Sequence, residues 1–173
     1  MDLSALLAGT KSGVDAFVTF LVTGVALMLG VWMIFSGLNK MVAFSKGERQ
    51  GQGTAGPVAI NLLIGSLLVQ LGVSINEIME SMFGGKAEDP NNAMMYMPDV
   101  AHANPLMEQA VNVGVLWIFA IGFVAVIRGF VLWNDLANGN RGGSENGWKG
   151  FWHIFFGAAC INITGVIRLF MSG

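Results

Sequence analysis

The residue types that most often carry chemistry in proteins are scarce in this sequence. Its single cysteine, Cys160, lies inside an apolar stretch, where it has no thiol partner and no neighbouring metal ligands. We interpret it as a small packing residue. His153 has no acidic residue one helical turn away, as a proton relay would need, and His102 has no cysteine or histidine at metal-ligand spacing.

Glycine-rich stretches in the chain do not have the pattern of a phosphate-binding loop. They lack the run Gly-x-x-x-x-Gly-Lys-Ser/Thr and follow no expected strand. No nucleophile, base and acid form a recognisable set either. We therefore expect a protein that is not an enzyme, with no catalytic residue, no cofactor and no metal site.

The composition favours a membrane protein. Hydrophobic residues make up 54% of the 173 residues and charged residues only 12%, whereas soluble domains carry about 25% charged residues. Four apolar windows are long enough to cross a hydrocarbon core about 30 Å thick, and in that core they should be helices. The windows run from about Ala16 to Leu38, Val58 to Ile78, Leu106 to Trp133 and Phe151 to Met171.

The first window differs from a secretion signal. A signal peptide has a basic start and an apolar stretch of about 7–15 residues, but here Asp2, Lys11 and Asp15 precede a longer span. We therefore expect this segment to be retained.

Charge predicts the orientation of the spans. The two segments that join spans one to two and three to four are basic, while the connection between spans two and three is acidic. By the positive-inside rule, the basic turns face the cytoplasm and both termini lie outside. The basic residues of the two turns are Lys40, Lys46, Arg49, Arg141 and Lys149.

The sequence contains an internal repeat with an offset of 92 residues. The pattern Gly-x-Arg-x-Gly occurs at Gly47–Gly51 and again at Gly139–Gly143. The two units then start on the same side of the membrane, which makes the repeat parallel. We expect an all-α fold of two tandem helical hairpins, residues 1–83 and 105–173, joined by an acidic extracytoplasmic connection, residues 84–104.

On the spans, glycines occur in pairs seven or eight residues apart, which is about two helical turns. The two glycines of a pair therefore lie on the same helix face, where another helix can approach closely. Two interpretations stay open: packing within the chain, and packing against other copies of it. The glycines are Gly30, Gly37, Gly65, Gly72, Gly122, Gly129, Gly157 and Gly165.

Among the polar residues within the spans, we single out Gln70, Asn162 and Arg128. Gln70 and Asn162, which the 92-residue offset superposes, are expected to be buried amides that hold helices together rather than line a pore. Arg128 lies five residues before Trp133 and can snorkel to the head groups. At the 92-residue offset, Arg128 aligns with Ser36 of the first hairpin, so only the second hairpin has an arginine at this position. There Arg128 can also mark a contact with lipid, a basic conduit or a partner.

The second half resembles a known family. The run IGFVAVIRGFVLW, the turn GNRGG and the segment GWKGFWHIFFGAACINITGVI are similar to the DotE/IcmC proteins of type IVB secretion systems and to the TraQ-like proteins of IncI-type conjugation systems. The positions that carry the resemblance are Arg128, Gly129, Gly139, Gly142, Gly143, Gly150, His153, Gly157, Asn162 and Ile163.

The resemblance implies a structural subunit of an envelope machine that transfers DNA or proteins. The architecture is also similar to conjugative pilins, which are hydrophobic two-helix hairpins with a basic turn. These likenesses imply as partners membrane phospholipid, other copies of the chain, other secretion or conjugation subunits, and DNA or protein cargo in transit. They imply assembly into a ring, a channel or an extracellular filament. A small transporter or ion channel is the alternative.

Overall fold

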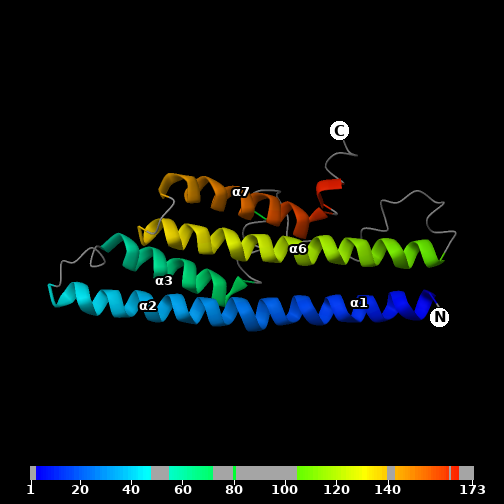
Figure 1. Cartoon of the computed structure of the whole chain (residues 1–173), viewed down its shortest axis with the longest axis horizontal. Coiled ribbons are helices and arrows are strands. Elements are labelled where there is room, and N and C mark those ends of the chain that lie inside the picture. Colours follow the sequence, from blue (N-terminus) through cyan, green and yellow to red (C-terminus); the bar gives the residue numbers. More distant parts are fainter. Residues whose placement is uncertain are drawn as a thin grey trace.

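The computed structural model describes residues 3–47, 55–71, 80, 105–139, 143–163 and 165–167. Every element in these ranges is helical, and the labels follow Figure 1. The elements are α1 Leu3–Thr19, the π-helix η1 Phe20–Ala26, α2 Leu27–Ser45, α3 Ala55–Val69, α6 Pro105–Ala137 and α7 Gly143–Ile161.

Two long helical rods run side by side in the same direction (Figure 1). The first rod is α1, η1 and α2, which follow one another without a break, and the second is α6. The shorter helix α3 packs back along α2, and α7 packs back along α6. The C-terminal ends of α2 and α6 and the N-terminal ends of α3 and α7 therefore all lie at one end of the molecule, which we call the turn end.

Two helices in the described part of the chain are long and apolar enough to cross a membrane. They are Gly9–Ser45, with 37 residues, and Leu106–Ala137, with 32 residues; Ala55–Val69 is a shorter apolar helix. At 1.5 Å per residue the first is about 55 Å long and the second about 48 Å. Both exceed the roughly 30 Å hydrocarbon core, so part of each helix would extend into the head-group region or beyond.

The helices also extend past the apolar windows in a way that the sequence prediction missed. Lys40 lies inside α2, and Lys149 lies inside α7 near its start, although both were placed in the basic turns. The physical reason is that backbone hydrogen bonding continues beyond the apolar residues, so hydropathy marks the membrane-facing part of a helix and not its ends. The chain from residue 72 to residue 79 and from residue 168 onward lies outside the described residues.

A glycine in the left-handed conformation ends each of the two long rods. Gly47 has φ +74° and Gly139 has φ +68°, values that glycine adopts without the strain of a Cβ atom. In both turns the glycine N–H donates to the carbonyl three residues earlier, Phe44 and Leu136, at 3.1 Å. From the sequence alone, Asn138-Gly139 is a strong turn dipeptide, and the structure has a turn at these two residues.

The π-helix η1 changes which side of the first rod is buried. Val14 and Leu21 are buried seven residues apart, as on one α-helical face, and Ala26, five positions after Leu21, is buried as well. Gly30 and Met33 continue the new stripe. A π-turn inserts one extra residue into an α-helix, so η1 allows the α1 part to face α6 while the α2 part faces α3.

The core is apolar and joins the two hairpins. One cluster brings together buried side chains of the α2–α3 and α6–α7 pairs, among them Ile64, Leu68, Val126 and Phe130. A second, smaller cluster joins Val14 of α1 to α6. The two hairpins therefore share one packed interior.

Candidate functional site

The closest helix contact of the first hairpin is a pair of glycines. A Cβ atom on Gly30 would lie 2.7 Å from the Gly65 carbonyl oxygen and 2.7 Å from the Val69 nitrogen. A Cβ atom on Gly65 would lie 2.7 Å from Ile34 Cγ1 and 2.8 Å from the Gly30 carbonyl oxygen. Real Cβ atoms do not approach backbone this closely, so α2 and α3 can meet here only because neither residue has a side chain.

The second hairpin repeats this contact at equivalent positions. A Cβ atom on Gly122 would lie 2.7 Å from the Gly157 carbonyl oxygen and 2.8 Å from Ile161 Cγ1. A Cβ atom on Gly157 would lie 2.8 Å from the Gly122 carbonyl oxygen and 2.9 Å from the Val126 nitrogen. Each of these four residues follows its counterpart in the first contact by 92 positions. We call the two contacts the glycine seams.

The remaining candidate glycines differ in their surroundings. Gly37 meets Leu62 of α3, at 3.1 Å from a Cβ atom, and Gly129 meets Ile154 and Gly150 of α7. The atoms nearest to a Cβ atom on Gly165 belong to the Asn162 side chain of its own segment. The close approach of a different helix at Gly165 stays a prediction.

A polar cluster joins the two hairpins at the turn end. Asn138, at the C-terminal end of α6, donates from Nδ2 to Asn61 Oδ1 of α3 at 3.0 Å and to its own-helix carbonyl at Asn134 at 2.7 Å. Lys40 Nζ of α2 donates to Asn138 Oδ1. Asn61 is only 1% exposed. We call Lys40, Asn61 and Asn138 the inter-hairpin clasp.

The clasp is a polar link between the first hairpin and the second, and the sequence prediction did not identify it. Asn61 is an amide within an apolar helix, and its position alone could have drawn attention to it, because a buried amide needs a hydrogen-bond partner. Asn138 was interpreted only as a turn residue. Its second role depends on how the hairpins pack, which no local pattern encodes.

The basic residues of the turns lie in different surroundings. Lys40 belongs to the clasp, and Lys46 is exposed at the C-terminal end of α2. Lys149 forms an ion pair with Glu145, with Nζ 2.6 Å from Oε1. This pair lowers the pKa of Glu145, first through the Lys149 hydrogen bond and then through its charge. Arg49 and Arg141 lie outside the described residues, as does Gly72 among the glycines.

The polar residues within the spans lie in different environments. Asn162 is 3% exposed, whereas Gln70, at the end of α3, is exposed. Asn162 agrees with the expected burial and Gln70 does not, and the helix contact expected of each amide stays a prediction. Arg128 is exposed on the outer face of α6, where its side chain is free of the helix contacts made by its neighbour Gly129.

The start of α7 carries a band of aromatic rings. Trp148 stacks on Phe151 with ring centroids 5.8 Å apart, and Trp152 stacks on Phe156 at 5.1 Å. His153 lies within this band, with Nδ1 2.7 Å from the Lys149 carbonyl oxygen. Aromatic rings beside a lysine are typical of the membrane–water interface, which fits a membrane boundary at the turn end.

Comparisons with protein-family models, with curated proteins and with solved structures find no match. The function is therefore argued from the seams, the clasp and the exposed surfaces. Among the described residues, no group of three or more His, Cys, Asp or Glu side chains could hold a metal ion.

Proposed function

We propose that this chain is a non-enzymatic structural subunit of a type IV secretion or conjugation apparatus, of the type IVB class, in the bacterial inner membrane. In this proposal the four apolar segments cross the membrane as two tandem hairpins. The observation that carries it is the pair of glycine seams, because Gly30–Gly65 and Gly122–Gly157 make the same contact 92 residues apart. Such a duplicated hairpin looks like two conjugative-pilin hairpins in series.

The outer surface supports a membrane location. Large apolar side chains cover the first rod, with Met28 74% and Trp32 71% exposed. Exposed apolar areas of this extent indicate contact with lipid or with another protein. Phe20 and Phe35 extend the same surface, at 62% and 59% exposed.

The packed interior supports assembly rather than conduction by one chain. The clusters between the hairpins are apolar, and the fully buried side chains include Phe130, Ile64 and Leu68. A selective pore is instead lined by carbonyl groups or by rings of polar and charged side chains. We infer that a conduit forms only when several copies assemble into a ring, a channel or a pilin-like filament.

The proposed orientation has the turn end in the cytoplasm and both termini in the periplasm. Lys40, Lys46 and Lys149 lie at the turn end, and basic residues favour the cytoplasmic side. There they would meet anionic phospholipid head groups, other apparatus subunits or the DNA or protein in transit.

A double substitution tests the role of the basic turns. Replacing Arg49 and Arg141 with glutamate should reduce transfer while the protein still inserts in the membrane. Lys11→Glu, a charge reversal far from the turns, serves as the control and should leave transfer unchanged. Normal transfer by a correctly inserted double variant would contradict a transfer role for the turns.

Reconstitution separates the proposal from a small transporter or ion channel. Purified protein in liposomes should move no solute on its own, and electron microscopy of the purified protein should show rings or filaments. Solute uptake that saturates with solute concentration would instead establish a transporter.

A further inference from the structure

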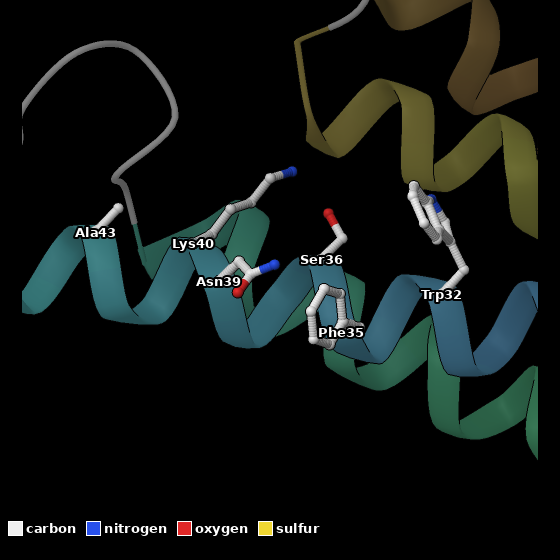
Figure 2. A pocket seen from close by; sticks show the side chains of 6 residues that line it. All are labelled: Trp32, Phe35, Ser36, Asn39, Lys40 and Ala43. Carbon is white, nitrogen blue, oxygen red and sulfur yellow. The ribbon is translucent and has the colours of Figure 1, made fainter.

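A hollow of about 290 Å³ lies on the surface of α2 near the turn end. Its lining residues all belong to α2: Trp32, Phe35, Ser36, Asn39, Lys40 and Ala43. Figure 2 shows Trp32, Ser36 and Lys40 projecting from the same side of the helix, with the Ser36 hydroxyl between the other two. At 1.5 Å per residue, the hollow extends for about 17 Å along α2.

Three polar side chains in the hollow can donate hydrogen bonds, and one of them, Lys40, is held in place by a bond of its own. Lys40 Nζ is fixed by its bond to Asn138 Oδ1, and because an ammonium has three donors, two remain. Within the part of the chain that the structure describes, the side chains of Ser36 and Asn39 make no hydrogen bond. In a membrane, polar groups of this kind need an acceptor, because leaving them unpaired is costly.

The remaining walls of the hollow are apolar and aromatic. Trp32 and Phe35 are 71% and 59% exposed, and they lie on the side of the hollow away from the end of α2. Lys40 lies five residues before Ser45, the last residue of α2, or about 8 Å from the helix end. The hollow therefore has its charged part near the membrane boundary and its apolar part deeper in the bilayer.

We propose that this hollow is a binding site for one anionic phospholipid. The phosphate accepts hydrogen bonds from Lys40 Nζ, Ser36 Oγ and Asn39 Nδ2, and the first part of an acyl chain lies against Trp32 and Phe35. No carboxylate is among the residues that line the hollow, so its lining offers one cation and neutral donors to an anionic ligand. The inference rests on the membrane location in the proposed function, and it adds the lipid class and the site.

The second hairpin does not offer the same site. At the 92-residue offset, Arg128 stands in the place of Ser36, and Leu132 stands in the place of Lys40. The hydroxyl and the ammonium are both replaced, so the proposed donor set belongs to the first hairpin. We therefore expect one such lipid per chain.

Lipid retention by the purified full chain tests the site. The protein in mild detergent is mixed with equal amounts of phosphatidylglycerol and phosphatidylcholine of the same acyl chains, and native mass spectrometry measures which lipid stays bound. A separate arm adds inorganic phosphate in excess. The variants are Lys40→Met, which removes the charge, and Ser36→Leu, which fills the hollow without changing Lys40. Lys46→Met, at an exposed lysine of the same turn end, is the matched control.

The expected result is one retained phosphatidylglycerol per chain, with a preference of about fivefold over phosphatidylcholine, as a basic residue near a membrane surface provides. Lys40→Met and Ser36→Leu should abolish the preference, and Lys46→Met should keep it. Equal loss in Lys46→Met, an unchanged preference in Lys40→Met and Ser36→Leu, or displacement of the lipid by inorganic phosphate would overturn the site.

Fractionation of the cells distinguishes a failure of the lipid site from a failure of the proposed function. If the chain is in the membrane but shows no lipid preference, the lipid site is wrong and the proposed function stands. If the chain is in the soluble fraction, the proposed function is wrong and the site fails with it. Circular dichroism checks that each variant keeps the helical content of the unmodified chain.

Discussion

Gly30 and Gly65 lie so close together that a Cβ atom on either would stand less than 3 Å from the carbonyl oxygen of the other, at 2.7 and 2.8 Å. Gly122 and Gly157 have the same relationship, with the same two distances. Two helix pairs thus meet through backbone at matched positions. This geometry makes the seams sensitive to the addition of a single methyl group.

Gly157→Ala should destabilise the protein by about 1–3 kcal/mol, the usual cost of forcing extra atoms into a packed site. Its Cβ atom would meet backbone atoms of Gly122 and Val126 that cannot move without shifting α6. Unfolding in detergent micelles measures the effect.

The matched control is Gly114→Ala. Gly114 lies in α6, and a Cβ atom there would have no neighbour within 4 Å. The substitution should stabilise the chain by about 0.5–1 kcal/mol through helix propensity. Equal destabilisation by both substitutions would mean that the seams are not close contacts.

The inter-hairpin clasp should show energetic coupling. We expect a double-mutant cycle between Asn61→Ala and Asn138→Ala to give a coupling free energy of about 0.6 kcal/mol, the average for polar contacts between membrane helices. Ser45→Ala provides a reference, because the Ser45 hydroxyl bonds only to Val42 within its own helix. Strictly additive effects of the Asn61 and Asn138 substitutions would show that the clasp does not couple the hairpins.

Deleting Thr23 should disrupt the first seam. The deletion removes the extra residue of η1. Because each residue of an α-helix adds a rotation of about 100°, α2 would rotate by about that angle relative to α1. Gly30 would then turn away from Gly65. A cross-link between cysteines at Leu29 and Ser66, tested in a Cys160→Ser background, reports the rotation as a change in yield.

The matched deletion removes Ala5, near the start of α1 and before the seam. This deletion leaves the rotation of α2 relative to η1 unchanged, so the cross-link yield should stay the same. An equal change of yield in both deletions would mean that η1 does not set the face of α2.

Acidification should break the Glu145–Lys149 pair. Because the pair lowers the pKa of Glu145 in the folded chain, its contribution to stability is present above the unfolded pKa and is lost as the pH falls through the folded pKa. Carboxyl NMR of labelled Glu145 measures that pKa, and Lys149→Gln should raise it. Both groups are exposed, so we expect little change in unfolding. An unchanged pKa in Lys149→Gln would contradict the pairing.

The sequence was informative where a local rule decides the structure. Glycine spacing identified Gly30, Gly65, Gly122 and Gly157 as close-contact positions, because helix periodicity sets which residues share a face. Asn138-Gly139 predicted its turn, because a left-handed residue there favours glycine.

The sequence was less informative where the structure depends on distant contacts. The π-helix η1 has no sequence signature of its own, because it responds to two partners, α6 and α3, on different sides of the rod. The Asn61–Asn138 bond joins residues 77 positions apart, which only the packed hairpins bring together. Lys40 was misplaced because an apolar window does not mark a helix end.

The central claim is a structural role in transfer, and a clean deletion of the gene tests it most directly. Transfer of plasmid DNA or of a reporter protein is counted in the deletion strain, with and without the unmodified gene supplied in trans. The account predicts that transfer falls to background, that unrelated envelope export is unchanged and that the supplied gene restores transfer. Normal transfer in the deletion strain would contradict the account.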